Sequence, residues 1–365
     1  MTDLRARMLE AYRGRAGSAT PLGIYARYLP RGERERDARN RGLGLIEYLP
    51  PVTLLAPPWH FYDEFLSEVR GAELTIRKYR DGEGWVERRT YRTPVGSIWQ
   101  ENAKDPGGVG SEHIRKHWIA APEDYRTMTW IVRHTEFASN AALVEERLRV
   151  LGNDGVVLAR LDRTPYQKCL IELAGPERFL VDLLEHPEEV TELLEAMEVR
   201  QDEAFERALA SPLEVLWQPD NVTCEMTPPD AFEAYLLPIY RRRAAAAEAA
   251  RKRYLVHMDG RLGPLAPHIA ASGIHAVESF TLPDMGGDLG LAEARRLFPR
   301  AVPHPSVPSN WFALSDAELE ARARALSAEL RGTPSMLQVS EDIPPNELGR
   351  VLDAVLRATQ GAPGE

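Results

Sequence analysis

The chain has 365 residues, of which 44% are hydrophobic and 27% are charged, and its formal net charge is −10. This composition is typical of a globular protein with a large core, and the charge argues against nucleic acid and anionic membranes as partners, because both repel an acidic chain. The two cysteines form no CxxC pair and no apolar run is long enough to cross a bilayer, so we expect a cytoplasmic protein without a disulfide framework.

Short apolar runs alternate with longer amphipathic segments along most of the chain. The strand candidates are residues 51–57, 155–161, 213–219, 253–259, 275–280, 300–305 and 334–340. Helix candidates lie between most of them, and the longest spans 176–209 with a break near Pro187. This alternation predicts a parallel sheet with helices outside it. We therefore predict one α/β domain over residues 1–365, a (β/α)₈ barrel covering about 18–358 with an N-terminal helical extension.

Residues 73–99 break this rhythm. Alternating apolar and polar residues stand on both sides of the turn signal RDGEG. The pattern predicts a β-hairpin insertion over the mouth of the barrel.

The segment YLVHMDGR contains the first candidate site residues. Side chains alternate faces along a strand, so His257 and Asp259 point the same way, with Leu255 deeper on that face. Two metal-binding groups at the carboxyl end of a strand stand where barrel enzymes keep their active sites. The alternative is a buried histidine that only forms a structural hydrogen bond to its neighbouring aspartate.

Two further carboxylates follow late strand candidates. Glu278 is a lone charge in the apolar run HAVESF, so it needs a metal or a partner such as an arginine. Glu341 follows the last strand candidate in QVSEDIPP, where Asp342 is better explained as a helix cap. We interpret Glu278 and Glu341 as candidate ligands.

Four weaker candidates for lining a substrate cavity also follow strand-like runs. They are Asp220 and Asn221 in WQPDNV, His304 in VPHPS and Tyr166 in RTPYQK. An ordinary turn or loop explains each of them as well.

Several segments together resemble the uroporphyrinogen decarboxylase-like superfamily over roughly residues 18–358. The closer resemblance is to its corrinoid-dependent methyltransferases, and a more distant one is to the catalytic barrel of cobalamin-independent methionine synthase. The segments that carry it are RYLPRGER, TPVGS, RTPYQKCLIELAGPERFLVDLLEHPEEVTELL, HMDGRLGPLAPHIAASGIHAVESF and SEDIPPNE. Each motif is loose alone, and the five in this order are more specific for the fold.

In the methyltransferase branch, one strand supplies a histidine and a cysteine, the next a glutamate and the last a cysteine, and together they hold zinc. By position the resemblance implies the ligands His257, Asp259, Glu278 and Glu341, with both cysteines replaced by carboxylates. Carboxylates suit manganese, iron(II) or magnesium, and zinc remains an option. Activation of a thiol is therefore in doubt. No nucleotide cofactor is expected.

The decarboxylase branch is matched less well. The resemblance assigns Arg27, in RYLP, to one of two arginines that bind the acidic substrate, but Gly23 stands at the position of the other. The acidic chain is also a poor receptor for a substrate with many carboxylates.

Two enzyme hypotheses and one binding hypothesis remain at this stage. The first is a metal-dependent, methyltransferase-like enzyme that acts on a small polar substrate, with a corrinoid protein as partner and a homodimer as the family-level expectation. The second is a metal-free decarboxylase that uses Arg27 and a carboxylate of raised pKa. The third is a binding protein without turnover.

Overall fold

The computed structural model describes residues 3–17, 19–59, 64–82, 84–104, 112–341 and 343–360. Asp342, the predicted helix cap, and Glu83, in the turn predicted for the hairpin, lie outside the described residues. The chain divides into two compact units. The barrel unit comprises Met1–Leu49, Ala141–Arg160 and Ser211–Glu365, and the second unit comprises Pro50–Asn140 and Leu161–Ala210.

The barrel unit contains one sheet of eight parallel strands, as predicted. In sheet order they are β13 (Val302–Pro305), β12 (Ala276–Phe280), β11 (Arg253–Met258), β10 (Val215–Val222), β9 (Gly155–Arg160), β2 (Leu43–Leu49), β1 (Leu22–Tyr25) and β14 (Leu337–Val339). A parallel bridge between Ser306 and Gln338 joins the two ends of this order. The strands are almost entirely buried, as parallel strands covered on both faces must be. The sheet is therefore a (β/α)₈ barrel.

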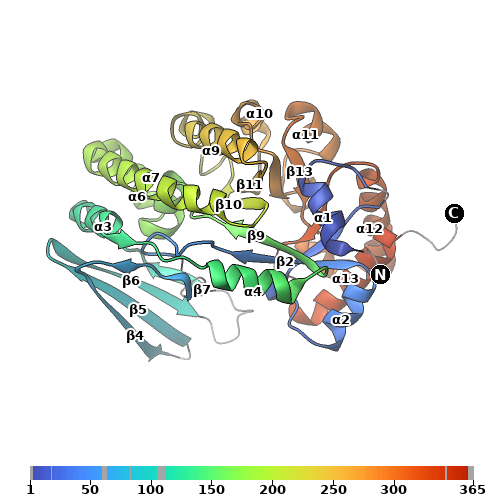
Figure 1. Ribbon diagram of the computed structural model, residues 1–365, viewed down its shortest axis with the longest axis horizontal. Helices are drawn as coiled ribbons and strands as arrows, with labels where there is room; N and C mark the ends of the chain where they lie inside the picture. The colour runs from blue at the N-terminus through green and yellow to red at the C-terminus, as the bar shows by residue number, and fades with distance from the viewer. Residues whose placement is uncertain are drawn as a thin grey trace. The chain divides into compact units, whose positions relative to one another are not determined.

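Helices in the barrel unit follow or precede the strands. Their bounds are α1 (Leu4–Tyr12), α2 (Glu33–Asn40), α4 (Ala141–Leu151), α8 (Pro229–Ala231), α9 (Leu237–Ala249), α10 (Ala266–Ser272), α11 (Leu291–Leu297), α12 (Asp316–Leu330) and α13 (Pro345–Gln360). Short 3₁₀ or π turns are η1 (Ala26–Tyr28), η4 (Phe232–Leu236), η5 (Gly263–Leu265), η6 (Pro283–Met285) and η7 (Ser309–Ala313). Helix α9 packs on β11 and α11 packs on β13 (Figure 1).

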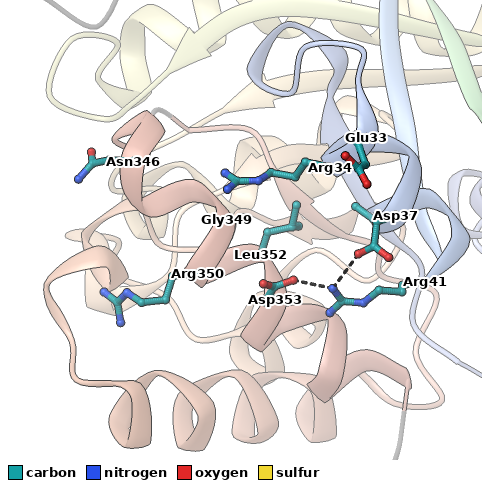
Figure 2. Close-up of a pocket in the computed structure, with 10 residues that line it drawn as sticks. Glu33, Arg34, Asp37, Arg41, Asn346, Gly349, Arg350, Leu352 and Asp353 are labelled. Carbon is teal, nitrogen blue, oxygen red and sulfur yellow. Dashed lines mark hydrogen bonds and ion pairs between the residues drawn. The ribbon is translucent and has the colours of Figure 1, made fainter.

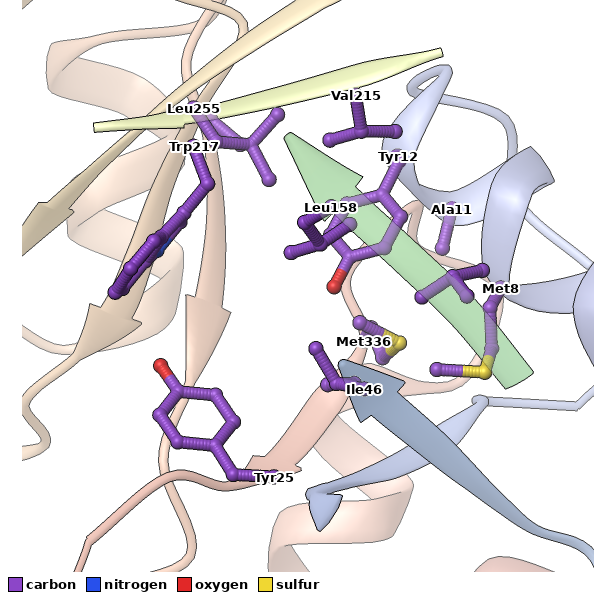
Figure 3. Packing of buried hydrophobic residues seen from close by; sticks show 12 residues of the cluster. Met8, Ala11, Tyr12, Tyr25, Ile46, Leu158, Val215, Trp217, Leu255 and Met336 are labelled. Carbon is purple, nitrogen blue, oxygen red and sulfur yellow. The ribbon is translucent and has the colours of Figure 1, made fainter. Parts of the chain in front are cut away.

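The N-terminal extension closes one end of the barrel core. Figure 3 shows side chains of α1 packed against inward-facing residues of the strands, among them Met8, Ala11, Tyr12, Ile46, Leu158, Val215 and Met336. A Cβ on Gly44 would lie only 2.2 Å from Met8 Sδ. Glycine in β2 therefore leaves the space that α1 fills.

The sequence missed the first strand and misplaced another. Residues 51–57 form only isolated bridges, Val52 with Ser139 and Leu54 with Leu66, and they belong to the second unit. Prolines at 50, 51, 57 and 58 remove backbone donors on both sides of this run, which limits its pairing with other strands. The six later strand candidates correspond to β9–β14.

The hairpin predicted at 73–99 is confirmed around its RDGEG turn, where Asp81 pairs antiparallel with Gly84, but it is part of a larger sheet. The segment forms the first part of a four-stranded antiparallel sheet, β4 (Glu73–Asp81), β5 (Gly84–Thr93), β6 (Gly96–Lys104) and β7 (Glu112–Lys116). The turn after β5 is stabilised by Thr93, whose hydroxyl donates to Gly96 O. The larger sheet was not predicted because two of the alternating buried positions of β6, Gln100 and Asn102, are polar.

The rest of the second unit is mainly helical. It contains α3 (Glu123–Arg133), α5 (Pro165–Lys168), the π-turn η3 (Cys169–Leu173), α6 (Pro176–Glu185), α7 (Pro187–Ala210) and the short strands β3 (Glu68–Val69) and β8 (Thr135–Glu136). The predicted break at Pro187 is confirmed, because α7 begins there. Within the described part of the chain, no helix is both long and apolar enough to cross a membrane.

Candidate metal centre

The barrel brings the main candidate residues to one end of its lumen. His257 stands near the end of β11 and pairs in register with Glu278 on β12. Asp259 follows β11 directly, and Glu341 follows β14 by two residues. Because all eight strands are parallel, their carboxyl ends lie at the same end of the barrel.

Three of the four predicted ligands form a compact group. One ligand atom each from His257, Asp259 and Glu341 lies within 4.8 Å of the other two. His257 Nε2 is 3.5 Å from Asp259 Oδ2. His257 is 7% exposed, whereas Asp259 and Glu341 are only partly buried. One imidazole nitrogen and two carboxylates at this spacing fit a single divalent cation.

Glu278, predicted as the fourth ligand, lies outside this group. It is fully buried, and its carboxylate accepts hydrogen bonds from His257 Nδ1 at 2.6 Å, Trp217 Nε1 at 2.7 Å and the hydroxyl of Tyr25. Tyr48 Oη is 3.4 Å from the same carboxylate. These donors occupy both carboxylate oxygens of Glu278. Glu278 therefore orients the ring of His257 through Nδ1, and Nε2 of the same ring faces Asp259.

Two other ligands have supporting contacts of the same kind. Asn221 Nδ2 donates to Asp259 Oδ2 at 3.0 Å, and Ser279 Oγ donates to Glu341 Oε1 at 2.9 Å. Each residue of the triad is therefore held by a side chain from another strand of the barrel. Asn221 was predicted to line the cavity, and the structure places it beside the triad.

The charges of the site shift the pKa values of its groups. Burial lowers the pKa of His257, but the carboxylates of Glu278 and Asp259 outweigh burial and raise it to about 10. Burial raises the pKa of Glu341. Burial would raise the pKa of Glu278 too, but His257 and the hydroxyl and indole donors outweigh it and lower the pKa. Three carboxylates around one imidazole favour a bound cation.

Two predicted cavity residues face elsewhere. Asp220 accepts from Tyr240 Oη on α9 at 2.6 Å and from Gln218 Nε2 at 3.2 Å. It is therefore on the outward face of β10, because Trp217 on the same strand points inward to Glu278. His304 accepts from Met336 N through Nδ1 and packs edge-on against Tyr12 of α1. It belongs to the core near the N-terminal helix.

The last two candidates, Arg27 and Tyr166, lie in different units of the chain. Arg27 is exposed on η1, donates to Tyr28 Oη at 2.7 Å and stacks over the Tyr28 ring at 4.7 Å. Tyr28 Oη in turn donates to the carbonyl oxygen of Ser340, the residue before Glu341. Tyr166 is buried in the second unit against Phe179, and its role as a substrate contact stays a prediction.

Sequence reasoning missed the aromatic residues that line this end of the lumen. Tyr48 packs on Trp217 with ring centroids 4.0 Å apart, and Tyr25 meets Tyr48 edge-on at 4.7 Å. The alternation of side chains along the predicted strand 213–219 could have identified Trp217 as an inward-facing residue. Tyr25 lies on β1, a strand that was not predicted.

A separate groove lies outside the barrel between α2 and α13 (Figure 2). Its volume is about 620 Å³. Arg41 bridges Asp37 on α2 and Asp353 on α13. The three arginines that line it are matched by three carboxylates, so its charges give no preference for an anion or a cation. The lining includes none of the predicted site residues.

Comparison with known proteins finds a similar fold but no matching family. No protein-family model matches the chain, and no curated protein sequence matches it. Among solved structures, a methyltransferase from Methanosarcina mazei is similar with a TM-score of 0.55 and 12% sequence identity. The similarity covers 98% of this chain and 98% of that one.

Proposed function

We propose that this protein is a metal-dependent enzyme of the methyltransferase-like branch of the uroporphyrinogen decarboxylase-like superfamily. The observation that carries the proposal is the group formed by His257, Asp259 and Glu341, with their ligand atoms within 4.8 Å. The similarity to a methyltransferase along almost the whole chain supports the same branch. The substrate is a small polar molecule, and a corrinoid protein is the proposed partner for methyl transfer.

The donor set indicates the kind of metal. It contains one imidazole and two carboxylates, and neither cysteine of the chain belongs to it. Oxygen-rich sites suit manganese or iron(II), although zinc binds such sites too. A metal held there supplies Lewis acidity toward a substrate oxygen or water.

The protein side chains have separate roles in this proposal. His257, Asp259 and Glu341 bind the ion. Glu278 fixes the ring of His257 through Nδ1, and Asn221 fixes Asp259. The rings of Tyr25, Tyr48 and Trp217 cover Glu278, so water is excluded from this carboxylate.

Metal analysis of the untagged protein, purified without chelator, tests the proposal. We expect about one equivalent of metal in the wild type, lost in Asp259→Ala. Asp316→Ala is the matched control, because Asp316 is an exposed carboxylate at the start of α12. A wild-type chain that takes up no manganese, iron or zinc would contradict the proposal, and so would Asp259→Ala with full metal content.

One observation favours a second candidate, metal-free decarboxylation. The buried position of Glu341 raises its pKa, which suits a general acid, and the exposed guanidinium of Arg27 is the proposed contact for a substrate carboxylate. This function predicts turnover that is insensitive to chelators and lost in Arg27→Ala. Activity that is lost on chelation and restored by added manganese would identify the metal-dependent enzyme and exclude metal-free decarboxylation.

A further inference from the structure

Ser279 has a backbone conformation that is unusual for a strand residue. Its φ is +62°, in the left-handed region, and the pairing of β12 with β13 shifts register between Glu278 and Phe280. Regular alternation would send Glu278 and Ser279 to opposite faces of the sheet. The bulge instead turns both toward the metal centre, where Glu278 contacts His257 and Ser279 contacts Glu341.

Three buried serines meet behind Glu341. Ser279 Oγ lies 2.8 Å from Ser306 Oγ and 3.0 Å from Ser340 Oγ, and Ser306 and Ser340 are hydrogen-bonded to each other. The three residues come from the ends of β12, β13 and β14, and none is more than 4% exposed. We call this group the serine cluster.

The hydrogen-bond directions in the serine cluster follow from its chemistry. An ionised Glu341 can only accept, so the hydroxyl proton of Ser279 points to Glu341 Oε1. Two hydroxyl protons, those of Ser306 and Ser340, remain for the three contacts among the serine oxygens, so one of these serines donates to the oxygen of Ser279 while the other donates within the serine cluster. The two outer serines therefore fix the direction in which Ser279 donates.

We propose that Ser279 is a positioning residue that holds Glu341 in the geometry for metal binding, with Ser306 and Ser340 fixing its hydroxyl. The inference rests on the proposed metal centre. Left-handed backbone is unfavourable for a residue with a Cβ, and such strain is concentrated at functional sites. A serine with only a packing role in β12 has no need of this conformation.

The test compares Ser279→Gly and Ser279→Ala with the wild type. Both variants lose the hydroxyl, but glycine accepts the left-handed backbone and alanine does not. Manganese affinity is measured from the EPR signal of free Mn²⁺, and the unfolding temperature is measured on the metal-free protein. Ser272→Ala is the matched control, because Ser272 is equally buried and its hydroxyl bonds to Ile269 O and Ile274 N of its own segment.

We expect both Ser279 variants to bind Mn²⁺ about 10- to 100-fold more weakly, while the glycine variant unfolds at the higher temperature of the two. The visible spectrum of bound Co²⁺ should change in both variants and stay unchanged in Ser272→Ala.

Three results would overturn the inference, and they are distinguishable. If wild type and Ser279→Gly bind Mn²⁺ equally, the metal centre is supported but Ser279 has no positioning role. If only Ser279→Ala binds Mn²⁺ weakly, the loss of affinity results from the lower stability of that variant, and the role of Ser279 is merely structural. If the wild type binds neither Mn²⁺ nor Zn²⁺, the metal centre and the role of Ser279 fall together.

Discussion

At the scale of single residues, the most informative group is Glu278, a carboxylate without exposed surface. Its lowered pKa means that it is charged, so its four donors provide all the compensation that water would otherwise give. The donors come from β1, β2, β10 and β11, which makes this one side chain a junction between strands that are distant in sequence.

We therefore expect Glu278→Ala to destabilise the protein by about 3–5 kcal/mol, because it leaves the donors of His257, Trp217 and Tyr25 buried without an acceptor. Urea unfolding followed by tryptophan fluorescence measures the loss. Glu278→Gln keeps the shape and one acceptor oxygen, so its cost should be clearly smaller. Equal stability of the wild type and the alanine variant would show that the junction does not stabilise the barrel.

His304 links a single buried residue to the pH dependence of stability. Burial lowers its pKa from 6.5 to about 4, and the nearby Glu278 opposes this shift only in part. Between these two values the unfolded chain binds a proton that the folded chain does not, so stability falls as the pH drops from 6.5 toward 4. The loss attributable to this residue is about 3 kcal/mol.

We expect His304→Asn to lose stability less steeply in this pH range, because asparagine can still accept from Met336 N but takes up no proton. The measurement is the difference in unfolding free energy between pH 7 and pH 4.5. His113→Asn, at an exposed histidine, is the control and should match the wild type. An unchanged pH dependence in His304→Asn would mean that His304 does not contribute to acid destabilisation.

At the scale of elements, the six later strands of the barrel were predictable and the two early strands β1 and β2 were not. Even the three-residue β14 was recognised within a longer apolar run, whereas β1 is four residues long and contains Gly23, and the apolar run 51–57 was chosen in place of the seven-residue β2 that precedes it. The alternation rule placed His257 and Asp259 correctly on one face. The same rule could not place Ser279, because a bulge with left-handed backbone has no sequence signal in a serine.

The same limit applies to the candidate site. Glu278 was recognised as a charge in need of a partner, but its partners include Tyr25 on the missed strand and Trp217 two strands away in the sequence. A ligand and a residue that orients a ligand have the same signature in a sequence. Asp220 and Asn221 are adjacent in sequence, yet only Asn221 turns to the triad.

Close packing between β2 and β9 depends on a glycine. A Cβ on Gly155 would lie 2.0 Å from Leu45 O, a backbone atom that cannot move without disturbing the ladder between these strands. We expect Gly155→Ala to destabilise the protein by at least about 1–3 kcal/mol, measured by urea unfolding. Gly290→Ala is the control, because no atom lies within 4 Å of its added Cβ. Equal stability of the two variants would contradict the proposed steric role.

At the scale of the whole molecule, the triad residues His257, Asp259 and Glu341 all belong to the barrel unit, although two separate strand ends, those of β11 and β14, supply them. The resemblance that suggested the fold spans both units, as does the structural similarity to the methyltransferase. An ion at the triad contacts only the barrel unit of this chain. Its effect on stability should therefore be distributed unevenly, and this distribution can be measured.

We expect Mn²⁺ to slow amide hydrogen exchange most strongly in β11 and β14, which end at the triad, and in β12, which carries the supporting residues Glu278 and Ser279. A ligand at 100 times its dissociation constant stabilises the state that binds it by about 2.7 kcal/mol, and local opening that breaks the site must overcome this amount. The four-stranded sheet of the second unit, β4–β7, contains none of the triad residues and should gain little protection. Asp259→Ala, which removes one ligand, should show no gain in any segment at the same Mn²⁺ concentration. Equal slowing in β4–β7 and β11, or slowing that persists in Asp259→Ala, would mean that the ion binds elsewhere, because an ion held at the triad can protect only the openings that separate its ligands.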